Sequence, residues 1–494
     1  MDAAARVQVL IVGAGPTGLT LAIDLARRGI SVRIVDRSTG PQPGSRGFGV
    51  KPRTLEIFDD LEVAGEFQAA NATARRTKVY LGGSLLADFM IKPQRPDLDR
   101  PYRDSVSLPQ TRTEEILRTA LARYSVQVEF GTTLVDLAEA DSRVTAELAD
   151  GGRIEADYLI GCDGGRSTVR KKVGIGFEGS TESAQALLAD VDVTGLPDLA
   201  VHLWTGPNQA FVLRPYRQGE PWQAVASFRP GMEPTLEWLQ ATARERTGLD
   251  SLRLTNPRWL SVWRYGLRLA TAYRRGRVFL AGDAAHVHSP FGAFGMNTGV
   301  QDAYNLGWKL ALVLDGADDA LLDTYQAERL PVGRAILQES DRRFTTSTAP
   351  PRLLRPFLRY LVKPFLVRMN HKGADDHPRY PASPLTVSSG RKRPQAGDIA
   401  PDGACRTSDG RTVRLFDLFR GVHFTVLSFG RSLPPLTGPV RGYRVGDDLV
   451  DIGGNLRRSY PRSGFVLIRP DNYIALLTDD SAKLINYLHR WGGS

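Results

Sequence analysis

The chain has 494 residues, of which 42% are hydrophobic and 24% charged, as expected for a globular protein of two or three domains. No stretch approaches the roughly 20 apolar residues of a membrane span, and no signal peptide is evident, so we expect a cytoplasmic protein. The net charge of +10 comes without a run of five basic residues, which argues against nucleic-acid binding. Two cysteines, Cys162 and Cys405, are too few for a disulfide framework or a zinc site, and we expect no metal.

The first predicted elements form a strand–helix–strand unit. Residues 7–12 are a short apolar run typical of a buried parallel strand. Residues 16–28 have a helical pattern that ends at Gly29. Residues 31–35 are β-branched and apolar, which predicts a second strand. The unit has about the 30 residues expected for this motif.

A glycine-rich turn joins the first strand to the helix. Residues 13–18 read Gly-Ala-Gly-Pro-Thr-Gly, a G-x-G-x-x-G pattern. Gly13 permits the tight turn, Gly15 lets a pyrophosphate approach the backbone, and Gly18 allows close helix packing. The helix N-terminus offers N–H groups to phosphates, and Asp36 ends the second strand, where a carboxylate accepts hydrogen bonds from an adenosine ribose. The pattern predicts a dinucleotide site and does not distinguish FAD from NAD.

Later segments alternate in character. Residues 126–160 and about 180–270 have strand patterns separated by turns rich in Asp and Gly, and we predict that the second stretch is an inserted sheet domain. Residues 277–281 form another short apolar strand, and helices dominate from 299 to 370. A stretch near 380–398 rich in Pro, Gly and Ser is typical of a linker, and residues 399–494 have strand and helix patterns of their own.

Two further motifs contain an aspartate at the end of a predicted strand. Residues 158–170 read YLIGCDGGRSTVR and include Asp163, and residues 277–286 read RVFLAGDAAH, include Asp283 and run on to Pro290. Alone, either aspartate is more readily explained as a cap of the following turn or helix.

The three motifs resemble, in order and spacing, those of the group A flavoprotein monooxygenases, the para-hydroxybenzoate hydroxylase and phenol hydroxylase type. The resemblance implies bound FAD, with Asp163 in contact with FAD and NADPH and Asp283 bonded to the flavin ribityl chain. Residues 45–47 and 52–56 resemble the loop beside the flavin, and residues 109–112 the segment whose Gln reaches the ribityl chain. Residues 295–299 and 302–306 resemble the loop and helix beneath the ring. The residues expected to contact the cofactor are Gly13, Gly15, Pro16, Thr17, Gly18, Asp36, Arg37, Arg46, Gln110, Asp163, Asp283, Gly295, Met296 and Asn297.

The family chemistry implied is NADPH reduction of FAD, addition of O2 to form a flavin hydroperoxide, and hydroxylation of an aromatic ring, here expected to be a polycyclic polyketide. No side chain is identified as a catalytic acid or nucleophile, and His286 and His288 are expected to be structural. Pro290, Phe291 and Phe294 are expected near the flavin, and Phe294 stands where the family usually has Gln, which alters the packing around the flavin. Phe211, Trp222 and Phe228 are candidates for the substrate pocket.

The predicted fold is α/β, with a Rossmann-like FAD-binding domain (residues 1–178 and 271–345), an inserted β-sheet substrate domain (179–270), a helix and linker (346–398) and a thioredoxin-like C-terminal domain (399–494). The last domain has only Cys405 where a redox thioredoxin needs C-x-x-C, so we expect it to pack or to mediate dimer contacts. We expect a monomer or homodimer that binds an aromatic small molecule and neither nucleic acid nor membrane. The alternatives are a Baeyer–Villiger oxygenase or epoxidase of the same family and a non-oxygenating FAD reductase.

Overall fold

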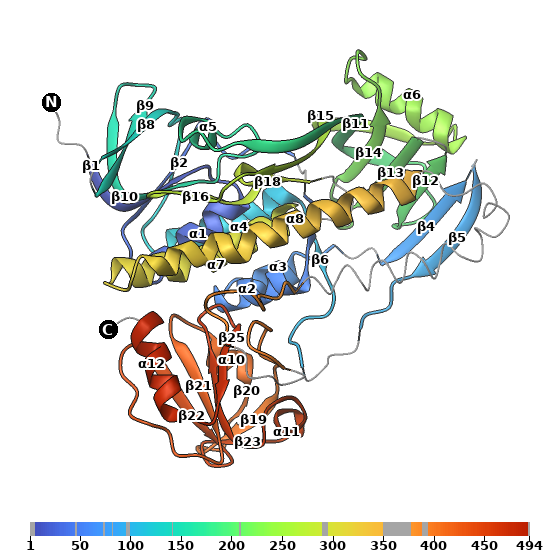
Figure 1. Cartoon of the computed structure of the whole chain (residues 1–494). Coiled ribbons are helices and arrows are strands. Elements are labelled where there is room, and N and C mark those ends of the chain that lie inside the picture. Colours follow the sequence, from blue (N-terminus) through green and yellow to red (C-terminus); the bar gives the residue numbers. More distant parts are fainter. Residues whose placement is uncertain are drawn as a thin grey trace.

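The computed structural model describes residues 5–44, 47–72, 75–81, 83–94, 99–140, 142–206, 209–288, 295–348, 377–387 and 394–492. Its strands form three large sheets and one short two-stranded pair, and long helices lie between the sheets (Figure 1). The fold is therefore mixed α/β, as predicted.

The first sheet has the order β16-β17-β10-β1-β2-β7, with β9 and β8 continuing from β10. Its centre is parallel, since β1 pairs in parallel with β10 and β2, and β10 with β17. α1 packs against both α4 and α7, and Val9, Leu10 and Ile11 of β1 are completely buried, which explains their apolar run. The bounds are β1 Ala5–Val12, α1 Pro16–Ala26, β2 Val32–Asp36, α4 Gln110–Ala122, β7 Val128–Phe130, β8 Leu134–Ala140, β9 Arg143–Leu148, β10 Arg153–Gly161, α5 Thr168–Lys172, β16 Arg274–Arg275, β17 Val278–Leu280 and α7 Gly295–Leu314.

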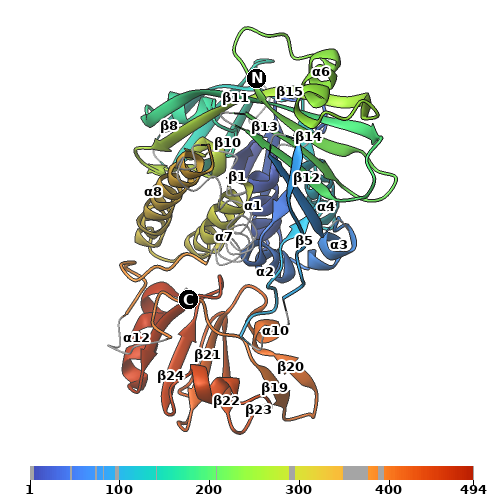
Figure 2. The ribbon, with the colours of Figure 1, turned by 90° about the vertical axis from the view of Figure 1, so that its right-hand side faces the viewer.

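The second sheet has the order β18-β15-β11-β14-β13-β12-β4-β5, and α6 covers one of its faces (Figure 2). Two of its strands, β4 and β5, come from residues 76–90, which the sequence analysis had assigned to the FAD-binding domain; β4 pairs in parallel with β12. Because β4 and β12 are far apart in the sequence, no local sequence pattern predicted this pairing. The bounds are β4 Arg76–Leu81, β5 Ser84–Met90, β11 Phe177–Thr194, β12 Val201–Gly206, β13 Gln209–Pro215, β14 Trp222–Phe228, α6 Leu236–Thr247, β15 Arg253–Ala270 and β18 His286–Val287.

The third sheet lies in the C-terminal part, with the order β20-β19-β23-β22-β21-β24-β25. It packs against α7 and α8 through a shared apolar cluster, in which Trp308 and Leu321 meet Phe424, Leu467 and Leu484. The bounds are α8 Ala320–Thr348, β19 Ala404–Thr407, β20 Thr412–Arg414, α10 Leu415–Phe419, β21 Phe424–Phe429, β22 Val440–Val445, β23 Leu449–Asp451, α11 Asn455–Ser459, β24 Gly464–Ile468, β25 Ile474–Thr478 and α12 Ser481–Trp491.

Buried charges also cross this junction. Arg469, which follows β24, donates to both carboxylate oxygens of Glu328 on α8, at 2.5 and 3.0 Å, and Lys309 on α7 donates to Glu328 at 2.9 Å. The Arg469 and Lys309 cations hold the pKa of the Glu328 carboxyl far below its usual range, although burial alone would raise it. Because removing one partner of a buried ion pair is costly, this network ties the C-terminal part to α7 and α8.

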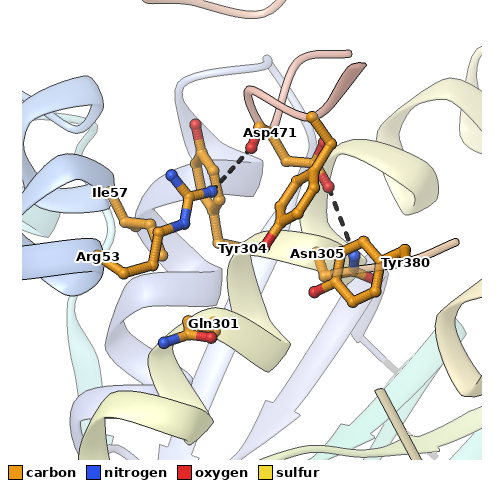
Figure 3. A pocket seen from close by; sticks show the side chains of 8 residues that line it. Arg53, Ile57, Gln301, Tyr304, Asn305, Tyr380 and Asp471 are labelled. Carbon is orange, nitrogen blue, oxygen red and sulfur yellow. Dashed lines mark hydrogen bonds between the residues drawn. The ribbon is translucent and has the colours of Figure 1, made fainter. Parts of the chain in front are cut away.

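Arg53 belongs to the same junction and not to the flavin loop that its sequence context suggested. It lies on α2 (Pro52–Asp60) beside α3 (Ala64–Ala69), donates to the Asp471 carbonyl at 2.8 Å, and faces a cavity of about 10 Å³ that Tyr304 also lines (Figure 3). Asn305 donates to the Asp471 carboxylate at 3.4 Å across this cavity.

Candidate functional site

The glycine turn after β1 has the geometry that a dinucleotide needs. Gly13 has φ +107°, and a Cβ there would overlap the carbonyl of Cys162; a Cβ on Gly18 would overlap the carbonyl of Gly13. A Cβ on Gly15 would have no atom within 4 Å. Gly13 and Gly18 are thus required by the fold, whereas the space at Gly15 is open and fits an approaching pyrophosphate.

The start of α1 adds to this fit. Gly15 is its N-cap, none of the side chains that the structure describes caps the helix, and Pro16 opens it. The first N–H groups of the helix and the positive end of its dipole therefore face the same open space at Gly15. An anionic group bound there would gain hydrogen bonds that the protein itself does not supply.

Asp36 lies at the end of β2, beside the glycine turn. Its Oδ2 accepts from the Ala14 N–H at 2.7 Å and its Oδ1 from the Ser38 N–H at 2.8 Å. Oδ1 also accepts from the Ser38 hydroxyl. The carboxylate is half-buried, and Oδ2 retains capacity for a second hydrogen bond. Arg37, the next residue, is exposed. The predicted contact of Asp36 with a ribose is compatible with this placement and stays a prediction.

The three motifs meet at one edge of the first sheet. Cys162 donates its N–H to the Val12 carbonyl at 2.7 Å, and Ala281 donates to the Gly161 carbonyl at 3.0 Å. The motifs thus follow the carboxyl ends of β1, β10 and β17, which are neighbours in the sheet. This edge is where open α/β sheets bind ligands.

Asp163 is both a cap and a candidate ligand. Its Oδ2 accepts from the N–H groups of Thr168 and Val169, at 2.6 and 3.2 Å, which is the capping role that the residue alone suggested. Its Oδ1 is buried and has no hydrogen-bond partner in the described part of the chain. Burial raises the pKa of Asp163. An orphaned buried oxygen suits a ligand that supplies a donor, such as a cofactor hydroxyl.

Asp283 is the exposed residue of the third motif, between buried Gly282 and Ala284 in the short 3₁₀ helix η1 (Gly282–Ala284). Its Oδ1 would lie 3.8 Å from a Cβ on Gly295, at the start of α7. Asp283 and the N-terminus of α7 therefore border the same space, as the predicted contacts of both with a flavin require.

Other predicted cofactor residues gather around the segment that enters β3 (Gly49–Val50), which pairs with β6 (Val106–Ser107). Gly47 donates its N–H to Gln110 Oε1 at 3.0 Å, and the Met296 sulfur would lie 3.6 Å from a Cβ on Gly47. Asn297 accepts from the Lys51 N–H at 2.8 Å and donates to the Gly49 carbonyl at 2.9 Å. The amide of Asn297 thus fastens this segment to α7, a positioning role that the sequence analysis did not identify.

The two histidines after Asp283 are buried and hydrogen-bonded to each other at 2.8 Å, as expected for structural residues. His286 also bonds Asp302 on α7 at 2.6 Å, and Arg329 on α8 donates to the other Asp302 oxygen at 2.7 Å. Burial and the neighbouring His286 lower the pKa of His288 well below its usual value. The pairing of Asp302 with Arg329 was not predicted, since the two residues come from different helices.

Phe211, Trp222 and Phe228 were wrongly proposed as substrate contacts. All three lie in the core between the second sheet and α6, packed with Leu239 and Ala243 of that helix. The opposite face of the sheet carries Arg214, Tyr216, Gln223 and Trp259, which the sequence analysis missed. Strand alternation separates the two sets, but it does not say which set meets the cofactor domain.

Four predicted residues, Arg46, Pro290, Phe291 and Phe294, lie outside the described residues. Cys162 and Cys405 are free thiols, and burial raises the pKa of Cys405 to about 12. In the part of the chain that the structure describes, no group of three or more His, Cys, Asp or Glu side chains could hold a metal. Across the same residues, no helix combines the length and apolar character that a membrane crossing demands.

Comparison with known proteins identifies the family. Residues 6–340 match the family model "FAD binding domain", and residues 393–494 match "Aromatic-ring hydroxylase, C-terminal". The chain is 38% identical to a flavin-dependent monooxygenase of Mycobacteroides abscessus (98% of this chain, 99% of the relative) and 37% identical to the 6-methylpretetramide 4-monooxygenase of Streptomyces rimosus (95% and 90%).

The crystal structure of aklavinone-11 hydroxylase with FAD and aklavinone superposes with a TM-score of 0.80 at 26% identity, over 99% of each chain. The relatives thus include polyketide-tailoring hydroxylases. The three motifs, the edge of the sheet where they meet and these similarities agree. The chain belongs to the FAD-binding aromatic-ring hydroxylases, the group A flavin monooxygenases, and is a FAD-dependent aromatic monooxygenase.

Proposed function

We propose that the chain uses NADPH and O2 to hydroxylate a fused-ring aromatic substrate of the polyketide type. The observation that carries the proposal is the convergence of the Gly13, Asp163 and Asp283 motifs at one edge of the first sheet. The names of the relatives that act on 6-methylpretetramide and bind aklavinone support this substrate class. We also propose a cytoplasmic location and a monomeric or homodimeric state.

In this proposal, FAD, when bound, supplies the redox and oxygen chemistry. The glycine turn and the N-terminus of α1 bind its pyrophosphate, and Asp36 and Arg37 flank the adenosine. Asp283 and Gln110 contact the ribityl chain, Asp163 contacts FAD and NADPH, and Arg46 is expected at the phosphates or flavin. Gly295, Met296 and Asn297 bring the N-terminal N–H groups of α7 towards the ring, where they favour negative charge.

The remaining parts of the chain have supporting roles in the proposal. The second sheet covers the site and excludes water from the reacting atoms. NADPH binds transiently, because the sequence has one G-x-G-x-x-G motif in a strand–helix context. The boundaries 1–178 with 271–345, 179–270, 346–398 and 399–494 remain our domain division, with β4 and β5 joined to the second sheet. We also infer that the C-terminal part is a redox-inactive thioredoxin-like domain, since Cys405 stands alone.

The test is aerobic turnover of the purified holoenzyme with NADPH, ¹⁸O2 and a panel of fused-ring phenols: 2-naphthol, 1-hydroxyanthraquinone and 1,8-dihydroxyanthraquinone. The proposal predicts a ring-hydroxylated product with one ¹⁸O atom for at least one phenol. A labelled lactone or epoxide would identify the Baeyer–Villiger or epoxidase alternative. NADPH oxidation that ends only in hydrogen peroxide with every phenol would contradict oxygenation of this class.

A further inference from the structure

Asp302 is a buried carboxylate in the second turn of α7. The helix begins at Gly295, and its first turn is the part that we propose lies beneath the flavin ring. The Oδ2 atom of Asp302 accepts from the Gly282 N–H at 3.1 Å and is hydrogen-bonded to His286 Nε2 at 2.6 Å. Because Gly282 directly precedes Asp283, the Asp302 carboxylate fastens the turn that contains Asp283 to α7.

The charge of this carboxylate opposes the helix on which it lies. The N-terminus of a helix carries the equivalent of about half a positive charge, which favours a bound anion. Asp302 is completely buried; burial alone would raise its pKa, but Arg329 and His286 outweigh burial and hold the pKa below its usual value. An ionised carboxylate close to the first turn therefore cancels the effect of the helix dipole unless a cation compensates it.

Arg329 on α8 supplies that cation. Its guanidinium is buried, and Nε donates to Asp302 Oδ1 at 2.7 Å. One of its Nη atoms donates to the carbonyl of Thr298, in the first turn of α7, at 3.3 Å, and the other donates to the Tyr380 hydroxyl at 2.8 Å. A single side chain thus neutralises Asp302 and holds the first turn of α7, while Tyr380 fixes the guanidinium from a third segment of the chain.

We propose that Arg329 is a positioning residue that sets the redox potential of the bound flavin through Asp302 and the first turn of α7. The inference rests on the proposed function, since it takes the N-terminus of α7 to lie beneath the ring. While Arg329 pairs with Asp302, the positive end of α7 stabilises the negative charge that the ring gains on reduction. Without the guanidinium, the carboxylate disfavours that charge and reduction becomes harder. Removal of the carboxylate alone has the opposite effect, because the guanidinium is then left uncompensated.

The experiment is an anaerobic titration of the FAD-loaded protein with reference dyes, which gives the midpoint potential of the flavin. It is made at about pH 8.5, above the range in which histidines ordinarily titrate, so that a proton on His286 does not replace the missing cation. Arg329→Gln should lower the potential and Asp302→Asn should raise it, each by about a three- to tenfold change in the equilibrium constant for reduction. The double variant should return close to the wild-type potential, and Arg329→Lys should lie between wild type and Arg329→Gln.

The matched control is Glu328→Gln, which alters the neighbouring residue of α8. Its buried ion pairs with Lys309 and Arg469 lead to the C-terminal part, so the variant should lose stability while its flavin potential stays close to that of the wild type. FAD content and melting temperature establish that each variant is folded. A purely structural role of Arg329 would move the potential of both single variants in the same direction, whereas charge compensation moves them in opposite directions.

An unchanged potential in folded Arg329→Gln, shifts of the same sign in Arg329→Gln and Asp302→Asn, or an equal shift in Glu328→Gln would overturn the inference. If Arg329→Gln does not retain FAD, Asp302→Asn and the double variant decide: a raised potential that the second substitution cancels supports the inference, and no rise contradicts it. None of these results bears on ¹⁸O incorporation, so failure of this inference is distinguishable from failure of the proposed function.

Discussion

Thr17 of α1 fills the space that a side chain on Gly282 would need. A Cβ on Gly282 would lie 2.6 Å from Thr17 Oγ1 and 3.2 Å from its Cβ, and Gly282 has φ +61°. This contact joins the first glycine motif directly to the motif of Asp283. The two halves of the proposed cofactor site are therefore held at a fixed distance by close packing that the sequence pattern alone did not reveal.

The contact predicts that Gly282→Ala damages the flavin site. The left-handed backbone costs an L-residue about 1–2 kcal/mol, and the overlap with Thr17 adds about 1–3 kcal/mol. Thermal unfolding and flavin absorbance measure the two effects. Gly410→Ala is the control, because Gly410 has φ +85° with no atom within 4 Å. Equal destabilisation of both variants, with full FAD in Gly282→Ala, would disprove the coupling.

Substitution of Gly15 separates folding from cofactor binding. Since a Cβ on Gly15 would meet no protein atom within 4 Å and φ is −73°, Gly15→Val should fold with a melting temperature close to that of the FAD-free wild type. It should lose at least about tenfold in FAD affinity, because the side chain fills the space required for pyrophosphate approach. Gly65→Val, also with open space around Cβ, should keep FAD. Unchanged FAD affinity in Gly15→Val would count against the first motif.

We also expect removal of the Asp283 carboxylate to cause loss of FAD. Asp283→Ala should purify with little flavin, because it removes the η1 carboxylate near the start of α7 that we propose contacts the ribityl chain. Asp315→Ala, at the other end of α7 beyond Leu314, is the control and should retain flavin. The absorbance of released FAD per protein measures the flavin content of both variants. Full FAD occupancy in Asp283→Ala would contradict the proposed contact of Asp283 with the ribityl chain.

The lowered pKa of His288 should make the stability of the fold depend on pH. Its folded-state pKa lies well below 6.5, through burial and the nearby groups His286 and Lys51, which outweigh Asp302. Below about pH 6.5 the unfolded chain gains a proton that the folded chain does not, so this residue's contribution to stability falls by up to about 1.4 kcal/mol per pH unit. Urea unfolding between pH 5 and 8 should give a shallower pH slope for His288→Gln than for wild type. Identical slopes would refute the prediction.

The buried ion pairs of Glu328 should contribute to the free energy of unfolding, because they join α8 to the C-terminal part. Glu328→Gln keeps the side chain's shape but leaves the Arg469 and Lys309 charges undercompensated, with an expected cost of about 3–5 kcal/mol. Glu237→Gln, an exposed site on α6, should cost less than about 0.5 kcal/mol. Denaturant unfolding measures both, and equal stabilities would show that the network contributes nothing.

Deletion of 399–494 should likewise impair stability, because Trp308 and Leu321 would lose their apolar partners.

The local parts of the fold were predictable. The strand expected at 7–12 is Ala5–Val12, and the helix expected at 16–28 is Pro16–Ala26, because apolar runs and glycine turns are set by neighbouring residues. The strands β4 and β5 were not predicted to join the second sheet, since their partner β12 lies more than a hundred residues away.

The site was predictable where a motif marks it and not where it depends on long-range pairing. The three glycine and aspartate motifs were found from sequence, and the structure brings them together. The buried pairs of Asp302 with Arg329 and of Glu328 with Arg469 were not predicted, because the partners come from distant segments. The choice of Phe211, Trp222 and Phe228 failed because aromatic residues on a strand mark a core face as readily as a pocket.

The most direct test of the account is the visible absorption spectrum of the purified protein, followed anaerobically as NADPH is added with and without the fused-ring phenols. The account predicts an oxidised flavin band that NADPH bleaches, at a rate that at least one phenol strongly increases. Bleaching that no phenol affects would favour a reductase or Baeyer–Villiger enzyme, and a protein that shows no flavin band even after incubation with FAD would contradict the central claim.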